Sequence, residues 1–328
     1  MFKLMIACTG RFAKLAAAAL LAAAGTAGAQ PYPNKIIRVI NPAAPGGNSD
    51  IVFRLLSPKM GEILGQQLVI DYRPGAGGVI GADITAKSAP DGYTTAIVAA
   101  SFVFNPALVK KLPYDTVNDF TPLGLVVDIP AVMVVHPALP VKSVKEFIAL
   151  ARERPGQIFF SSAGPGTVGH LAGELLNTVA KIKLVHVPYR GVAPATMDLI
   201  AGQVQMTIAS TPVVIEQVRG GKLRMLAQAG EKRSPTLPDV PTMQEAGVPG
   251  FVVSSGFSFI GPANMPRPVV EKLHGALVKA LNDPAIRKEL LDRGADPIGN
   301  TPEQHAAFIK SEIEKWHRVA AQAGIKPE

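Results

Sequence analysis

The chain has 328 residues, of which 33 are lysine or arginine and 25 are aspartate or glutamate, so its formal net charge is +8. The basic residues are scattered and only 6% of the chain is aromatic, which argues against nucleic acid as a partner. The only cysteine is Cys8, so the chain beyond it offers no disulfide, no thiol catalysis and no cysteine-ligated metal.

The first 29 residues have the pattern of a secretory signal peptide. A basic start precedes an apolar run of about ten residues, which is too short to cross a bilayer, and Ala27-Gly28-Ala29 has the small-x-small form of a cleavage site. No arginine pair precedes the run, so the twin-arginine route is not expected. We predict that residues 1–29 are removed and that the chain from Gln30 works in the periplasm, an oxidising compartment that suits a chain without thiols. A short N-terminal anchor is the alternative.

Strand-like and helix-like runs alternate along most of the remaining chain, which is typical of α/β folds with right-handed crossovers. Most of the strand-like runs are continuously apolar and rich in β-branched residues, a pattern that favours strands buried on both faces of a parallel sheet. Strands are predicted at Ile36–Ile40, Leu68–Tyr72, Thr94–Val98, Leu123–Val127, Ala131–Val135, Ile158–Ser161, Leu184–Val187, Gln205–Ala209, Leu223–Gln228 and Val252–Ile260. Helices are predicted at 49–64, 79–88, 143–153, 168–180, 194–202, 212–220, 267–281, 284–292 and 302–323.

Two local features modify this pattern. Pro58 should kink the first helix or end it early, because proline removes a backbone donor and crowds the preceding turn. The stretch from Glu231 to Gly250 is rich in proline and turn residues and is interpreted as a surface connection.

A break at Pro130 suggests where the chain passes between two domains. Two strand-like halves flank this proline, and the strand that ends at Gln228 is a candidate for the return crossing. We predict one domain from residues 30–125 plus 229–328 and an inserted second domain from residues 126–228. The fold class expected is a two-domain α/β fold with a mixed, mostly parallel sheet in each domain, and a ligand should bind in the cleft at the carboxyl ends of the strands.

Two strand–loop–helix units carry glycine-rich loops, Pro42 to Asp50 and Ser162 to Gly169. Each loop presents backbone N–H groups and the positive end of a helix dipole to one point, so two such loops facing each other predict a clamp for a small anion. An ordinary turn before a capped helix is the alternative for the first loop taken alone, and a packing role is the alternative for the histidine that begins the second helix. The candidate ligand-binding residues on these loops are Ala43, Ala44, Pro45, Gly46, Gly47, Asn48, Ser49, Ser162, Ala163, Gly164, Gly166, Thr167, Val168 and His170.

Five further residues are candidates for the same site. Tyr189 and Arg190 should lie beside the second loop, where the tyrosine can wall the pocket and the arginine can meet an anion or remain solvated. Ser101 and Phe102 follow a strand of the first domain. Asp128 lies at the proposed hinge and can accept a hydrogen bond from a ligand amine or cap a turn.

Few groups suited to catalysis accompany these loops. None of the six histidines form a pair three or four residues apart, and no G-x-S-x-G elbow occurs. The second loop matches the dinucleotide pattern G-x-G-x-x-G, but the next strand ends without the acidic residue that this pattern requires about twenty residues on. We expect no catalytic residue, no metal site and no cofactor. A third glycine-rich segment, Pro74 to Gly81, lines the rim of the cleft or forms a structural turn.

Several motifs together resemble the tripartite tricarboxylate transporter receptors, often called Bug proteins, over nearly the whole mature chain. The motifs are Tyr32-Pro33, the Pro42–Asp50 loop, Asp71-Tyr72-Arg73-Pro74-Gly75-Ala76-Gly77-Gly78, Ala89-Pro90-Asp91-Gly92-Tyr93, Leu112-Pro113-Tyr114-Asp115, Asp119-Phe120, Ser162-Ala163-Gly164, His170-Leu171-Ala172-Gly173-Glu174, Val187-Pro188-Tyr189-Arg190-Gly191, Lys232-Arg233-Ser234-Pro235 and Leu237-Pro238-Asp239-Val240-Pro241-Thr242.

The resemblance implies a periplasmic, flytrap-like solute receptor that grips a carboxylate with the loops Pro42–Asp50 and Ser162–His170, partly through ordered water. It also implies delivery to a membrane permease. Two positions depart from the family pattern: Ala43 stands where an aromatic residue is common, and Ala209-Ser210 stands where Asp-Asn is common.

The sequence therefore predicts an extracytoplasmic receptor for a small organic anion, a carboxylate, that acts as a monomer without catalysis. An exported enzyme that acts on a small organic acid and a ligand sensor for a membrane signalling partner are the alternatives.

Overall fold

The computed structural model describes residues 32–43 and 45–327. The chain divides into two units, Met1–Asn34 and Lys35–Glu328, and every helix and strand below belongs to the second. The predicted signal peptide lies outside the described residues. Within the described part of the chain, no helix combines the length and apolar character needed to span a bilayer.

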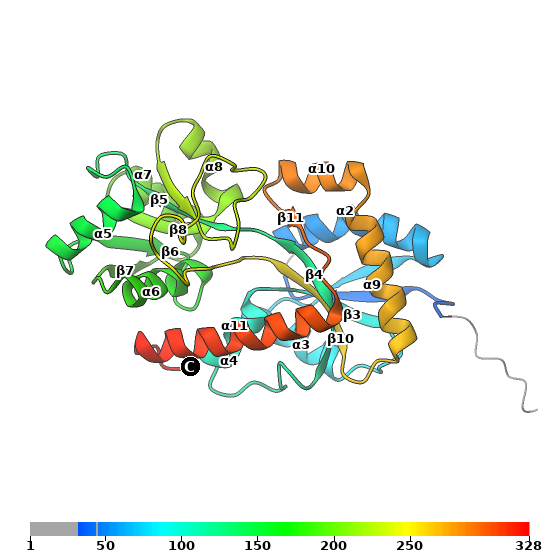
Figure 1. Ribbon diagram of the computed structural model, residues 1–328. Helices are drawn as coiled ribbons and strands as arrows, with labels where there is room; N and C mark the ends of the chain where they lie inside the picture. Colours follow the sequence, from blue (N-terminus) through cyan, green and yellow to red (C-terminus); the bar gives the residue numbers. More distant parts are fainter. Residues whose placement is uncertain (1–31, 44, 328) are drawn as a thin grey trace, which may run out of the picture. The chain divides into compact units, whose positions relative to one another are not determined.

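Two sheets organise the second unit (Figure 1). The strands are β1 (Ile37–Asn41), β2 (Leu68–Tyr72), β3 (Thr94–Ala99), β4 (Phe120–Asp128), β5 (Ala131–Val135), β6 (Phe159–Ser162), β7 (Val185–Pro188), β8 (Met206–Ser210), β9 (Arg224–Gln228), β10 (Phe257–Pro262) and β11 (Asp296–Pro297). The helices are α2 (Asn48–Leu64), η1 (Ala76–Gly78), α3 (Val79–Ala86), α4 (Ser101–Leu108), α5 (Val144–Glu153), α6 (Val168–Ala180), α7 (Val192–Ile200), α8 (Thr211–Arg219), α9 (Arg267–Leu281), α10 (Pro284–Asp292) and α11 (Pro302–Gln322).

The first sheet has the strand order β11-β4-β10-β3-β1-β2. Helices α2 and α9 pack together against one face, where Phe53 of α2 meets Phe259 of β10 with ring centroids 5.8 Å apart. Helices α3, α4 and α11 lie on the other face, where Phe104 of α4 packs edge-on against Trp316 of α11 at 4.7 Å. The carboxyl ends of β1 and β3 are therefore held between helices on both sides.

The second sheet has the order β7-β6-β8-β5-β9 and is also covered on both faces. Alternate residues of β5 point in opposite directions, as in any strand. Val132 and Val134 join a core cluster with Leu199 of α7, whereas Met133 and Val135 join a cluster that includes helices α5 and α6. Burial on both faces explains why β5 is continuously apolar.

The predicted α/β fold class, with a mixed sheet in each half of the unit, is confirmed. In the first sheet only the pairs β1–β2 and β1–β3 are parallel, and β10 and β11 pair antiparallel with their neighbours. In the second sheet β6 pairs parallel with β7 and β8, and β5 pairs antiparallel with β8 and β9. A continuously apolar run indicates a strand that is buried on both faces. Antiparallel strands are also buried in this way when helices cover both sides of the sheet.

Some element predictions also differ from the structure. Helix α2 continues through Pro58 to Leu64, since Pro58 lies on the exposed side, where water can reach the carbonyl that it leaves without a donor. The last long strand begins at Phe257 rather than Val252. Helix α4 and the short strand β11 were not predicted.

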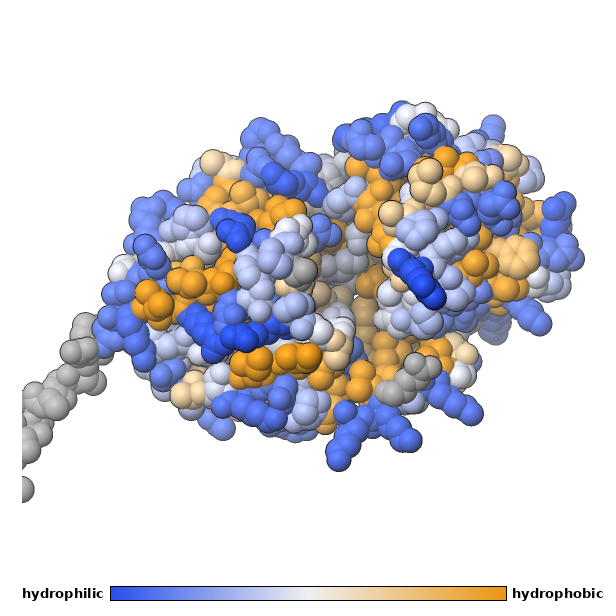
Figure 2. Space-filling view, turned by 180° about the vertical axis from the view of Figure 1, so that it is seen from behind, coloured by the Kyte–Doolittle hydropathy of each residue, from blue (hydrophilic) through white to orange (hydrophobic). Residues whose placement is uncertain are grey.

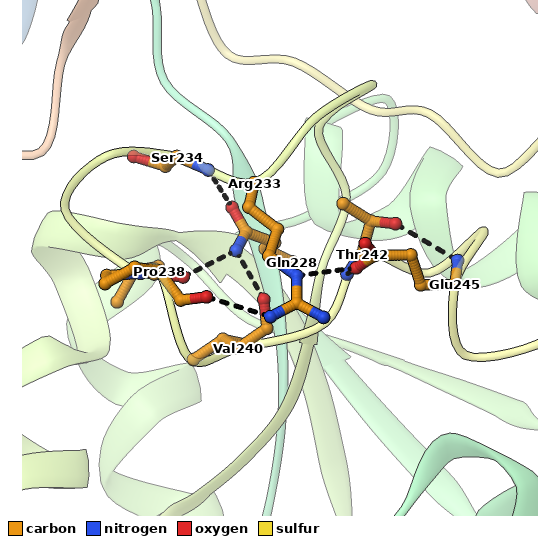
Figure 3. Close-up of polar contacts among 8 residues, drawn as sticks. Gln228, Arg233, Ser234, Pro238, Val240, Thr242 and Glu245 are labelled. Carbon is orange, nitrogen blue, oxygen red and sulfur yellow. Dashed lines mark hydrogen bonds and ion pairs between the residues drawn. The ribbon is translucent and has the colours of Figure 1, made fainter.

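The chain passes from the first sheet to the second between β4 and β5 and returns after β9 through residues 229–256. The buried side chain of Gln228 holds the start of this return segment (Figure 3). Its amide donates to the carbonyls of Leu237 (2.9 Å) and Val240 (2.7 Å), and its oxygen accepts from the Ser234 amide at 2.6 Å. Leu237 is buried, so the proline-rich stretch is fastened to the second sheet rather than being only a surface connection.

Strands from residues 37–128 and 257–297 thus form the first sheet, and strands from residues 131–228 form the second. The prediction of an inserted second domain stays a prediction on this arrangement.

Candidate functional site

A cavity of about 280 Å³ lies at the carboxyl ends of β1 and β3. Three helices begin at its wall: Ser49 lies in the first turn of α2, Gly78 precedes α3, and Ser101 is the first residue of α4. Helix N-termini carry unpaired N–H groups and a positive partial charge. No lysine or arginine is among the described residues that line the cavity. Neutral donors rather than cations would therefore meet an anion there.

Asn41 is the polar group that defines this cavity. It is the last residue of β1, has no exposed surface, and lines the cavity. Its Oδ1 accepts from the Ala43 amide at 3.1 Å and from the Ser49 hydroxyl at 3.0 Å, which fixes the side-chain amide. Its Nδ2 has no hydrogen-bond partner among the described residues. A buried donor without an acceptor costs about 1–3 kcal/mol, so an acceptor supplied by a guest would remove that cost.

Two more polar side chains line the cavity and lie near one another. Asn105 of α4 donates to the carbonyl of Gly77 at 3.3 Å. The hydroxyl of Tyr114 is buried beside Asn105; burial raises the pKa of Tyr114, and the Asn105 side chain opposes this rise. The phenol therefore stays protonated and can donate to a guest.

The first glycine loop is organised by Asp50. Its Oδ2 accepts from the Gly46 amide at 2.8 Å, while its Oδ1 accepts from Arg54 Nε at 2.9 Å and from the Tyr72 hydroxyl at 2.7 Å. Burial alone would raise the pKa of Asp50, but these donors outweigh burial and hold the pKa below its ordinary value. The amides of Gly46 and Ala43 are thus occupied by side chains of the loop itself. The first-turn amide of Ser49 has no acceptor among the described residues.

The second glycine loop is organised in the same way by Ser162 and His170. The Gly164 amide donates to Ser162 Oγ at 3.1 Å, and the Gly166 amide donates to His170 Nδ1 at 3.0 Å. Thr167 Oγ1 donates to the carbonyl of Gly164 at 2.7 Å rather than capping the helix. The amides of the first turn of α6 are left without an acceptor among the described residues.

A second histidine supports this loop from the neighbouring strand. His186 of β7 stacks on His170 with ring centroids 4.1 Å apart, and its Nε2 lies 2.7 Å from Ser162 Oγ. Burial lowers the pKa of His170, and burial together with the charge of His170 lowers the pKa of His186 to about 4. Both rings are therefore neutral at pH 7.

The remaining candidates have separate surroundings. The hydroxyl of Tyr189 donates to Asp198 at 2.7 Å, and burial and this carboxylate raise the pKa of Tyr189 to about 12. Arg190 is exposed. Asp128, at the end of β4, accepts from the Ser254 hydroxyl, and burial raises the pKa of Asp128 to about 6.

The structure brings only part of the predicted site to this cavity. Ala43, Ser49, Ser101 and Phe102 line it. The second-loop residues, Tyr189, Arg190 and Asp128 are not among its lining residues. Ala44 lies outside the described residues.

The second loop nevertheless approaches α4, since a Cβ built on Gly166 would lie 3.2 Å from Leu108 Cδ1. Figure 2 shows the surface hollowed between the parts of the unit built on the two sheets. A guest held by both the cavity and the second loop would have to extend along α4.

Sequence reasoning missed Asn41, Asn105 and Tyr114 as lining residues. Tyr114 lies in one of the motifs that carry the family resemblance, and Asn41 is a polar residue that ends a buried strand, so both positions offered a signal. Asn105 offered none, because its helix was itself not predicted.

Comparison with known proteins defines the class of protein first. The chain is 35% identical to "R. palustris Rpa4515 with adipate", with 90% of this chain and 100% of that chain covered and a TM-score of 0.75. It is 33% identical to "MatC (Rpa3494) from Rhodopseudomonas palustris with bound malate", with 88% and 99% covered and a TM-score of 0.71. It is 34% identical to the periplasmic binding protein BugD, with 90% and 100% covered and a TM-score of 0.72. These neighbours are solute-binding receptors and not enzymes.

The family follows from the sequence comparisons. The sequence model described as "Tripartite tricarboxylate transporter family receptor" matches residues 52–325. Protein BugT of Bordetella pertussis is 38% identical over 302 residues, which cover 91% of this chain and 92% of that protein. The chain therefore belongs to the tripartite tricarboxylate transporter receptor family, as the motifs predicted.

Proposed function

We propose that this receptor binds a small carboxylate with one carboxylate group in the cavity at the ends of β1 and β3. The Nδ2 of Asn41 carries this proposal, because it is a fully buried donor that lines the cavity and has no acceptor among the described residues. The adipate and malate bound to two structural neighbours support a carboxylate as the ligand class.

The donors at the cavity supply a large part of the free energy that binding a carboxylate requires. A hydrogen bond to a charged group contributes roughly 1.5–3 kcal/mol, and Asn41, Ser101 and Tyr114 offer three such donors. Each helix N-terminus adds about 0.3–1 kcal/mol. The gross sum of about 5–12 kcal/mol spans the roughly 8 kcal/mol of micromolar binding, but association costs are subtracted from it, so donors of the second loop are needed as well.

We further propose that the loop from Ser162 to His170 covers the same guest from the other side of the hollow, through the amides that begin α6. Closure would take place between a domain of residues 30–125 plus 229–328 and a domain of residues 126–228. The crossings near Pro130 and after Gln228 would act as hinges. A smaller radius of gyration with ligand in solution scattering would support closure, and an unchanged profile at saturation would contradict it.

The setting of the receptor follows from the same proposal. Residues 1–29 direct export and are removed, the mature protein acts as a monomer in the periplasm, and a membrane permease of the tripartite type receives the ligand. Family membership and the BugD neighbour support this setting.

The test is a panel of mono-, di- and tricarboxylates, with sugars and amines of similar size as controls. Carboxylates should raise the melting temperature of the purified protein and give saturable heats by calorimetry, while NMR of the ligand shows no turnover. Stabilisation by the sugars or amines alone, or conversion of a carboxylate, would contradict the proposal.

A further inference from the structure

Two imidazole rings lie face to face beside the second loop. His170 of α6 and His186 of β7 are stacked with centroids 4.1 Å apart and an interplanar angle of 17°. His186 stacks in turn on Phe160 at 4.9 Å. Two rings at this separation cannot both carry a positive charge without strong repulsion, so the pair accommodates one proton.

His170 also occupies a backbone donor of the loop that is proposed to cover the ligand. The Gly166 amide donates to His170 Nδ1 at 3.0 Å, and a ring nitrogen accepts only when it carries no proton. A carboxylate that approaches the loop competes with this nitrogen for the same N–H. Protonation of His170 at Nδ1 would end the competition, because the nitrogen becomes a donor.

Few other titratable groups surround this pair. Strands β6 and β8 pack against α6 and contain no titratable side chain, and β7 contributes only His186. Helix α11 also packs against α6, but none of its charged side chains shifts the pKa of His170, which burial alone lowers. On α6 itself, Glu174 is one turn further on and accepts from Asn177. The charge of a bound anion would therefore be the dominant new influence on the two rings.

We propose that carboxylate binding at the second loop is coupled to the uptake of one proton by the stacked pair, at His170 Nδ1. The proton comes from solvent and binds the lone pair that accepted from Gly166, so that hydrogen bond breaks and no covalent bond other than N–H forms. The released amide and the new imidazolium then both face the anion. His170 acts here as a positioning residue, because its protonation state decides whether the Gly166 amide is free to donate to the ligand. This inference rests on the proposed function.

Isothermal titration calorimetry with adipate and malate as probes tests this coupling. Titrations at pH 6.5 in MES and in imidazole buffer, which differ in ionisation enthalpy, give the number of protons taken up per ligand. The wild type should take up close to one proton more than the His170→Asn variant. In this variant Asn Oδ1 occupies the position of Nδ1 and accepts from Gly166 without titrating. Because the carboxyl groups of the probe titrate equally in both experiments, the difference in proton uptake between the two proteins comes from groups of the protein alone.

The pH profile gives a second readout. The dissociation constant of the wild type should fall by up to about tenfold per pH unit on acidification between pH 7.5 and 6, relative to His170→Asn. The matched control is His317→Asn, which removes an exposed histidine of α11 and should keep the wild-type uptake. Should His170→Asn fail to fold, the ¹⁵N shifts of the His170 ring in the wild type, with and without adipate, report the same protonation.

The outcomes of these experiments separate the coupling from the proposed function. Equal proton uptake by wild type and His170→Asn, or a neutral His170 ring in the adipate complex, would overturn the coupling while leaving the receptor function intact. Failure of the wild type to bind either probe or any carboxylate of the panel would overturn the proposed function and the coupling together.

Discussion

Replacing Asn41 by aspartate tests the cavity with almost no change in shape. One carboxylate oxygen of the variant can still accept from the Ala43 amide and the Ser49 hydroxyl, as Oδ1 does now. The other oxygen takes the place of Nδ2 and turns the only unpartnered donor of this side chain into a negative charge. The lost hydrogen bond to a charged guest is worth about 1.5–3 kcal/mol, which corresponds to roughly 10- to 150-fold in the dissociation constant. Like-charge repulsion, about 4 kcal/mol for charges 4 Å apart at an effective dielectric of 20, adds to this loss.

Thermal melting and calorimetry with adipate measure the effect. Ligand at 100 times the wild-type dissociation constant should stabilise the wild type by about 2.7 kcal/mol, or about 5 °C. A variant that binds at least 100-fold more weakly should retain no more than about 0.4 kcal/mol, a shift of about 1 °C or less. Burial should raise the pKa of the new carboxyl, so binding should partly recover as the pH falls from 7 to 5.

The matched control for charge is Gln67→Glu. Gln67 is exposed and immediately precedes β2, whose first residue pairs with the first residue of β1, so it lies at the opposite edge of the sheet from Asn41. This control should bind adipate as the wild type does. An Asn41→Asp protein with an unchanged dissociation constant would refute the assignment of the cavity.

Four other outcomes follow from the structure. Gly166 has φ +73°, and a Cβ at this position would meet Leu108, so Gly166→Ala should cost about 1–2 kcal/mol of stability and also weaken adipate binding. The control is Gly247→Ala, at φ +92° in open space, which should lower stability alone. Equal adipate binding by both variants would contradict the role of the second loop. The pKa of Asp128 in the folded protein is raised to about 6, so the protonated carboxyl favours the folded state, and this contribution is present below pH 4 and lost as the pH rises through 6. Asp128→Asn should therefore stabilise the protein at pH 7.5 by on the order of 2–3 kcal/mol in urea unfolding, and no gain in stability there would refute the burial argument. Burial lowers the pKa of His305 to about 4, and neither ring nitrogen has a partner among the described residues. The stability of the wild type should therefore fall as the pH drops from 6.5 toward 4, and His305→Leu should lose less stability over that range. Parallel curves of stability against pH for the two proteins would contradict this. Since neutral donors line the cavity, the adipate dissociation constant should change little between low and moderate salt, and a steep salt dependence would point to a cationic site elsewhere.

Strand positions could be predicted closely from the sequence because burial on both faces imposes continuous apolar runs. The runs at Leu68–Tyr72 and Ala131–Val135 match β2 and β5 residue for residue. Which strands pair antiparallel could not be predicted, since this depends on how the crossing segments return to each sheet. Helix α4 was missed because Asn105 and Pro106 oppose a helix locally, whereas packing of Phe104 on Trp316 stabilises it.

The candidate site shows the same division between local and tertiary information. The contact of His170 with the Gly166 amide joins residues four apart at a helix start and could have been predicted from local rules. The stacking of His170 on His186 depends on the pairing of β6 with β7. The unpartnered donor of Asn41 arises only because the Ala43 amide and the Ser49 hydroxyl fix its amide, a geometry that no sequence pattern specified.

A crystal structure of the protein with adipate is the most direct measurement of the central claim. The account predicts a carboxylate oxygen within hydrogen-bond distance, about 2.7–3.2 Å, of Asn41 Nδ2, with the loop from Ser162 to His170 closed over the ligand. Adipate bound elsewhere, or a cavity that stays empty while the protein is saturated, would contradict it.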